Sequence, residues 1–166
     1  MSNPDEPVIH IQHQNRKTLS MRVNLAGEVI VAIPNWMKPT HPQVKKFIKQ
    51  GLQKLDKLMP DEKPEAEHTQ ASIRRMVTTW AKRMDVKPKR VQFRQMTRKW
   101  GSCSSRGSIT LNEMLCYLPH RLVEYVVVHE LAHLTELNHD PAFWSLLGQY
   151  LPDYATLEDE LNGYHV

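Results

Sequence analysis

The sequence predicts an α+β fold in which a small antiparallel sheet packs against helices. Apolar and polar residues alternate in the segments 19–33 and 91–112, which indicates strands, whereas apolar residues recur at helical spacing between and after them. The chain has 166 residues, of which 40% are hydrophobic and 24% are charged. These proportions are typical of one globular domain, here residues 1–166, and exclude coiled-coil, collagen-like and disordered chains.

The N-terminal part, residues 8–58, is expected to form a β-hairpin followed by a helix. The alternation runs over 19–25 and 29–33, on either side of a turn at Ala26-Gly27. Residues 40–43 have the pattern of a capping box, and the apolar stripe that follows predicts an amphipathic helix over 44–58.

Residues 59–70 are rich in Pro, Asp, Glu and Lys, which predicts a surface linker. The remaining core, residues 71–166, is expected to begin with a helix. The elements predicted before the last third of the chain are a helix over 73–84, a strand over 91–97, a small-residue turn over 101–107 and a returning strand over 108–112.

Three helices are expected in the C-terminal half. Leu118-Pro119 begins a long apolar helix that runs to about Leu137, and Asn138 is expected to end it in a left-handed conformation. Asp140-Pro141 has the N-cap and first-turn residues of a second helix, and a third is predicted over 154–161.

The long helix contains the sequence His129-Glu130-Leu131-Ala132-His133. Histidines four residues apart lie on one face of a helix, so both imidazoles can reach one metal ion. Glu130 is offset by one residue and can act on a water at the metal without ligating it. This spacing is typical of zinc hydrolases.

A third ligand is needed to complete such a site. His139 lies ten residues after His129 and would follow the helix in a turn, whereas Glu158 and Glu160 are alternatives from farther along the chain. Three protein ligands leave one position of a tetrahedral zinc open, which is the catalytic arrangement.

Two segments carry a resemblance to a known family. The sequence HELAHLTELNHDPAFW, residues 129–144, resembles the YgjP-like metal-dependent hydrolases of the zincin superfamily, and KWGSCSSRGSITLNEMLCYLP, residues 99–119, resembles their second hallmark. The resemblance implies a zincin-like fold with the metal-binding helix in the C-terminal half. It also implies His129, His133 and His139 as zinc ligands, Glu130 as catalytic base, and kinship with SprT-like proteases.

The function predicted from these features is that of a zinc-dependent metallopeptidase, in which Glu130 removes a proton from zinc-activated water. Charge leaves two alternatives open. The segment 82–106 carries nine basic residues and one acid. It could clamp the phosphates of a nucleotide, which would make the protein a nucleoside triphosphate pyrophosphatase, or it could contact nucleic acid in a zinc-stabilised binding module.

Several neighbours of the motif are candidates for further roles. Asp140, Glu124 and Glu136 are candidates to orient a ligating histidine, and Phe143 and Trp144 are expected to pack over the motif helix. Cys103 is either a buried small residue or a ligand or reactive thiol. The candidates for substrate binding are Arg98, Trp100, Ser102 and Asn112.

The expected compartment is the cytoplasm. Residues 1–7 are polar and acidic, which predicts no signal peptide, and no stretch approaches the roughly 18 apolar residues of a membrane span. The two cysteines, Cys103 and Cys116, are too few for a disulfide framework, which favours a reducing environment.

Overall fold

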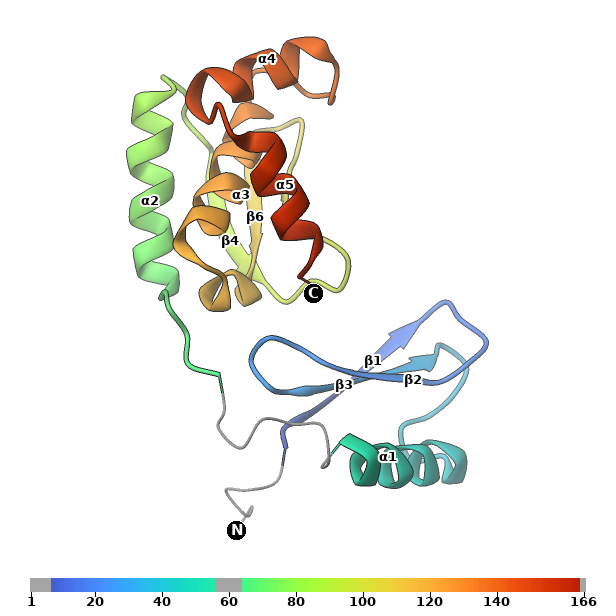
Figure 1. Ribbon diagram of the computed structural model, residues 1–166. Coiled ribbons are helices and arrows are strands. Elements are labelled where there is room, and N and C mark those ends of the chain that lie inside the picture. The colour runs from blue at the N-terminus through green and yellow to red at the C-terminus, as the bar shows by residue number, and fades with distance from the viewer. Residues whose placement is uncertain (1–6, 56–63, 165–166) are drawn as a thin grey trace. The chain divides into compact units, whose positions relative to one another are not determined.

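The computed structural model describes residues 7–55 and 64–164, which divide into two compact units, 1–64 and 65–166 (Figure 1). The division falls inside the segment 59–70, where the sequence predicts a linker. Residues 59–63 of that segment and the last part of the expected helix over 44–58 lie outside the described residues. The predicted α+β class is confirmed, and each unit is described here by itself.

Unit 1 is a three-stranded sheet with one helix. Its elements are β1 (Ile9–Gln14), β2 (Ser20–Val23), β3 (Val29–Pro34) and α1 (Pro42–Leu55). The expected hairpin is β2–β3, which pairs antiparallel, with Met21 opposite Val31. Strand β1 was not predicted; it pairs parallel with β3, which makes β3 the central strand. His41 rather than Thr40 stands before α1, and its Nδ1 accepts a hydrogen bond from the backbone N–H of Gln43 at 3.2 Å.

The core of unit 1 follows from the alternation of β3. Val29, Val31 and Ile33 are fully buried together with Val44 of α1, and the apolar residues of β2 and of the helix stripe pack around them. The lysines of α1 are exposed where side chains are described, as expected for an amphipathic helix.

Unit 2 carries the histidine motif. Its elements are α2 (Gln70–Arg83), β4 (Arg90–Arg94), β5 (Gly101–Cys103), β6 (Ser108–Asn112), a 3-10 turn η1 (Glu113–Tyr117), α3 (His120–Ala132), α4 (Pro141–Tyr150) and α5 (Tyr154–Asn162). Thr69 and Ser72 form a reciprocal capping box at the start of α2, in which each side chain accepts a hydrogen bond from the backbone of the other residue.

The sheet of unit 2 is mixed, with the strand order β4-β6-β5. The prediction that 91–97 and 108–112 form an antiparallel pair is wrong: β4 and β6 are parallel, and the hairpin partner of β6 is β5. The reason is that the chain crosses from β4 to the far edge before it turns back. Strand β5 consists of three small residues, Gly-Ser-Cys, so no apolar alternation indicated a strand within the expected turn.

Helix α3 is the centre of unit 2 and contacts α2, α4, α5 and β5 (Figure 1). Nine of its thirteen residues are buried, which agrees with its nearly continuous apolar sequence. The helix ends at Ala132, not near Leu137 as expected, because the carbonyl of Glu136 turns inward to the ring of His133. Asn138 is not left-handed: in the described part of the chain, Asp85 is the non-glycine residue with a positive φ.

None of the helices in the described residues combines the length and the apolar character needed to cross a membrane.

Candidate metal centre

Three histidine side chains meet at the end of α3. His129 lies in the last turn of the helix, His133 is its C-cap residue, and His139 precedes Asp140, the N-cap of α4. The Nε2 atom of His139 is 2.8 Å from Nε2 of His129 and 3.1 Å from Nε2 of His133. The structure therefore brings together the three residues that the sequence nominates as ligands.

The arrangement fits a bound metal ion better than a set of hydrogen bonds. The Nδ1 of His133 is 2.9 Å from the carbonyl oxygen of Glu136, so Nδ1 carries the proton and Nε2 presents a lone pair to the cluster. A tetrahedral zinc with Zn–N bonds of 2.0–2.1 Å separates two ligating nitrogens by roughly 3.3 Å. The observed separations are close to this value, and the potential ligand atoms all lie within 4.8 Å of one another.

Electrostatics keep the cluster in the form that binds metal. Burial, assisted by the neighbouring His133 and His139, lowers the pKa of His129 from 6.5 to about 3. Burial also lowers the pKa of His133, although its bond to the Glu136 carbonyl opposes this. His129 and His133 are therefore neutral at physiological pH, as a metal ligand must be.

Glu130 is buried, with 6% of its surface exposed, and its Oε2 has no hydrogen-bond partner among the described residues. Burial raises the pKa of this carboxyl from 4.5 to about 8, and the charge of Lys99 opposes the shift. The carboxyl lies directly against Gly101 of β5, where an added Cβ would stand 2.6 Å from Glu130 Oε1. Sequence reasoning missed this role of Gly101, whose only signal was a glycine within the second hallmark.

Two aromatic residues of α4 hold the histidine rings. Phe143 is fully buried, and its ring centroid is 4.5–4.9 Å from those of all three histidines. Trp144 stacks on His139 with centroids 5.5 Å apart, and its Nε1 donates to the His139 carbonyl at 3.2 Å. The expected packing of Phe143 and Trp144 over the motif is thus observed.

The expectation that an acidic side chain orients a ligand is wrong for the candidates named. Asp140 accepts the backbone N–H groups of Ala142 and Phe143 as the cap of α4, and Glu124 pairs with Arg121. Glu136 acts on His133 through its backbone carbonyl. A carbonyl can do this work because it fixes the ring tautomer as a carboxylate would.

The alternative third ligands lie elsewhere. In the described residues, the group able to hold a metal at this place consists of the three histidines and includes neither Glu158 nor Glu160. Glu158 belongs to α5, where its charge contributes to raising the pKa of Tyr125, after the larger effect of burial. The short connection between α3 and α4 places His139, and neither of these glutamates, beside His129 and His133.

The four candidates for substrate binding have different surroundings. Ser102 lies on β5, an edge strand of the sheet, and Trp100 directly precedes that strand; both are half-buried, whereas Arg98 is exposed. Asn112 has no exposed surface. Its Nδ2 donates to the carbonyls of Met96 and Lys99, both at 2.9 Å, and its Oδ1 accepts from the N–H of Met114. These bonds leave no free amide group for a substrate, so we assign Asn112 a structural role.

Cys103 is half-buried and lies outside the metal-binding group. Burial, together with the charge of Glu130, raises the pKa of its thiol from 9.0 to about 11. A thiol that stays protonated is a poor ligand and nucleophile, which favours the interpretation of Cys103 as a small packing residue.

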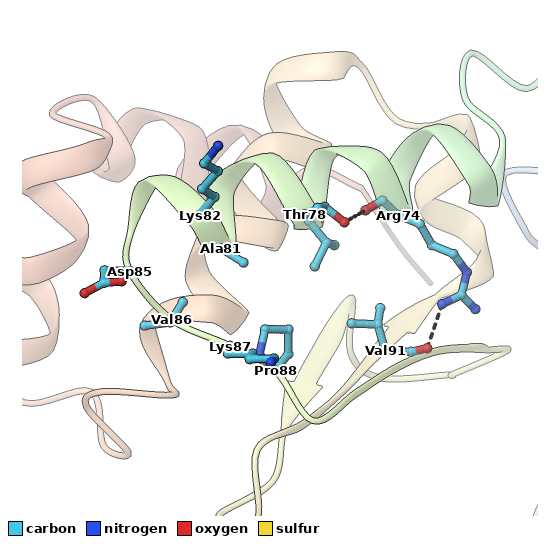
Figure 2. Close-up of a pocket in the computed structure, with 10 residues that line it drawn as sticks. Arg74, Thr78, Ala81, Lys82, Asp85, Val86, Lys87, Pro88 and Val91 are labelled. Atoms are coloured by element: carbon cyan, nitrogen blue, oxygen red, sulfur yellow. Dashed lines mark hydrogen bonds between the residues drawn. The ribbon is translucent and has the colours of Figure 1, made fainter.

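Two of the cavities in unit 2 differ in size and in the residues that line them. The larger, of about 630 Å³, is bounded by α2 and the segment from Asp85 to Val91, and no metal-site histidine lines it. Figure 2 shows the guanidinium of Arg74 reaching from α2 to the Val91 carbonyl, at 2.7 Å. The smaller cavity, of about 350 Å³, has His133 in its wall. It is therefore the one that adjoins the histidine cluster.

The chain has similarities to known proteins. In the solved structures, the metallopeptidase zymogen abylysin of Pyrococcus abyssi is similar with a TM-score of 0.50 and 22% identity, over 54% of this chain and 90% of that chain. The metallopeptidase zymogen jannalysin of Methanocaldococcus jannaschii gives a TM-score of 0.49 and 20% identity, over 55% and 94%. At such identities the likeness to abylysin concerns the fold alone. No curated protein matches the chain.

The family described as YgjP-like, metallopeptidase domain, matches residues 62–164, which include all of the described residues of unit 2. Neither this match nor the solved structures point to nucleic acid as a partner of the segment 82–106. The match covers more than half of the chain and contains the whole histidine cluster, and the chain therefore belongs to the YgjP-like family of metallopeptidase domains.

Proposed function

We propose that this protein is a zinc peptidase in which His129, His133 and His139 hold the ion and Glu130 is the general base. The observation that carries the proposal is the convergence of three Nε2 atoms. Glu130, which follows His129 in the chain, is buried, and its Oε2 has no hydrogen-bond partner among the described residues. Family membership supplies the class of reaction, which is metal-dependent hydrolysis of peptide bonds.

Each part of the site has a separate role in the proposed reaction. Zinc held by the histidines would act as a Lewis acid that polarises the peptide carbonyl and lowers the pKa of water to about 7. Glu130 removes a proton from the attacking water through its unpaired Oε2 and returns it to the leaving amine. Gly101 leaves the space that the Glu130 carboxyl occupies, and the ring of Phe143 packs against all three histidine rings.

The substrate would lie along β5. This strand is at the edge of its sheet, so its outer backbone groups can pair with an extended peptide, and Gly101 brings the strand against Glu130. Trp100 and Ser102 flank this point, and Arg98 lies just before it. The two free cysteines agree with a reducing compartment, and we place the enzyme in the cytoplasm.

Metal content and turnover of paired variants test the proposal. His133→Ala and His139→Ala are expected to lose zinc, whereas Glu130→Gln is expected to keep it and to lose at least about a hundredfold in activity on unfolded casein. His13→Ala and Glu158→Gln serve as matched controls, because neither residue belongs to the metal-binding group.

The same assay, run on nucleoside triphosphates with and without chelator, separates the nucleotide alternative. Chelator-sensitive release of pyrophosphate in the absence of casein cleavage would overturn the peptidase proposal. Full activity of Glu130→Gln would refute the assigned base, and zinc retained by His139→Ala but lost by Glu158→Gln would refute the assigned third ligand.

A further inference from the structure

The smaller cavity of unit 2 adjoins the metal centre through His133. Its volume of about 350 Å³ is within the range of ligand-binding pockets. Three parts of the chain line it: the segment after α2, the turn between β5 and β6, and the residues that follow α3. The lining residues that could contact a ligand here are Lys87, Lys89, Arg106, His133, Leu134 and Leu137.

The charge of this cavity has one sign. Lys87, Lys89 and Arg106 contribute three cations, and none of the ten described lining residues is acidic. The larger cavity differs, because Asp85 lines it and because Arg74 is engaged by the Val91 carbonyl and by the ring of Phe93. An anionic group is therefore attracted to the cavity beside His133 more than to its neighbour.

The turn that carries Arg106 is held in place by its own hydrogen bonds. Ser104 accepts the N–H of Gly107 at its carbonyl and the N–H of Ser108 at its Oγ, at 2.9 and 3.1 Å. Gly107 has φ +81°, and its carbonyl accepts the N–H of Lys89 at 2.8 Å. A Cβ at position 107 would lie 3.6 Å from Lys89 Cγ and 3.7 Å from Leu134 Cδ2, so this backbone packs between the lysine stem and α3.

We propose that this cavity is the subsite that receives an acidic side chain, Asp or Glu, of the peptide substrate. The proposal rests on the proposed peptidase function and names its substrate class. The carboxylate would bind Lys89 and Arg106 by charge-assisted hydrogen bonds, while Leu134 and Leu137 contact the methylene groups. His133 both lines the cavity and is a proposed zinc ligand. The acidic residue of the substrate that enters the cavity should therefore lie close to the scissile bond.

The test uses the zinc-loaded full chain and sets of decapeptides that differ at one position as Glu, Gln or Lys, scanned across the cleavage site found in casein. The wild-type protein is expected to prefer Glu over Gln at one position by about tenfold in kcat/KM. The double variant Lys89→Gln, Arg106→Gln is expected to reduce this ratio to near one. Lys89→Glu with Arg106→Glu should instead favour Lys at that position.

The matched control is the double variant Lys45→Gln, Arg75→Gln, which removes two cations that line neither cavity and should leave the ratio unchanged. A second readout is independent of cleavage: binding of the fluorescein-labelled Glu and Gln peptides to zinc-loaded Glu130→Gln, measured by anisotropy. There, too, the preference for Glu should disappear with the Lys89 and Arg106 substitutions.

The outcomes keep the two proposals apart. Cleavage of peptides with no preference for acid at any position would overturn the subsite and leave the peptidase function standing. A wild-type protein that cleaves no peptide would contradict the peptidase function, and the anisotropy arm would then decide the subsite. The subsite would be overturned by equal binding of the Glu and Gln peptides. It would also be overturned if a nucleoside triphosphate at micromolar concentration displaced the Glu peptide.

Discussion

Gly101 of β5 and Glu130 of α3 are in such close contact that a Cβ at position 101 would lie 2.6 Å from both Cγ and Oε1 of Glu130. Real Cβ contacts are never this short, and the buried Glu130 side chain has little room to move. The absence of a side chain at position 101 therefore leaves the space that the carboxyl of the proposed base occupies.

Gly101→Ala is expected to displace the Glu130 carboxyl and to lower kcat by about a hundredfold, since a shift of about 1 Å in a catalytic group has effects of that size. The zinc content should be unchanged, because the three atoms that an added Cβ would meet first all belong to Glu130. Turnover on casein and metal analysis of the same preparation check this. Thr79→Ala, at an exposed position of α2, is the control, and wild-type activity of Gly101→Ala would disprove the positioning role.

Glu130→Gln is expected to stabilise the metal-free protein, and the gain should depend on pH. The pKa of Glu130 is raised from 4.5 to about 8 on folding, so its ionisation costs stability as pH rises through this window, up to about 5 kcal/mol above pH 8. Below pH 4.5 the carboxyl is protonated in both states and the variants should be equally stable. Urea unfolding with chelator at pH 5, 7 and 9 measures the difference.

Glu160→Gln, at an exposed position, provides the control for that series. Its difference in stability from the wild type should not grow as the pH rises. Saturating zinc should shrink the gap, because the cation favours the ionised carboxylate. A stability difference that stays constant from pH 5 to pH 9 would mean that Glu130 is not buried in the way described.

Trp144→Leu is expected to weaken zinc binding by about 10- to 100-fold, the range seen when a group that orients a ligand is removed. The substitution removes both the stacking on His139 and the hydrogen bond from Nε1 to the His139 carbonyl. Trp144→Phe keeps an aromatic ring at this position and should lose less affinity for zinc. Competition with a chromophoric chelator measures the affinities, with the exposed Trp36→Leu as control. Unchanged affinity of Trp144→Leu would show that His139 is held by other contacts.

Asn112→Ala is expected to destabilise unit 2 by about 3 kcal/mol or more, since it leaves two carbonyls and one N–H without their partners. Enough folded protein should remain at low temperature to measure KM, which we expect to be close to wild type. Thermal unfolding and steady-state kinetics check the two halves of this prediction. A raised KM at unchanged stability would return Asn112 to the substrate site.

The local parts of the site could be predicted from the sequence. The spacing of His129 and His133 on one helix and the cap residues Asp140 and Pro141 follow from rules that act within a few residues. These rules placed the histidines, the proposed base and the start of α4. The end of α3 was misjudged because the inward turn of the Glu136 carbonyl depends on the ring of His133, which no propensity describes.

The long-range parts could not be predicted in this way. The parallel pairing of β4 with β6 depends on a crossover that the side chain of Asn112 holds through Met96 and Lys99. The strand β5 has three residues without apolar alternation. Its role in the site depends on the contact of Gly101 with Glu130 of α3, 29 positions further along the chain. Such contacts are set by tertiary packing, which a single sequence does not display.

The three histidines proposed as ligands fall within eleven residues of one another, whereas β5, which lies against Glu130, is far away in the chain. Closing so short a loop costs little entropy, so the ion-binding loop is a feature of low contact order, and the catalytic alignment is one of high contact order. Partial unfolding that separates β5 from α3 would therefore abolish catalytic activity while the metal ion stays bound. Along a single urea titration, turnover is expected to vanish before zinc is released, which makes loss of activity the earliest sign of loosening in this fold.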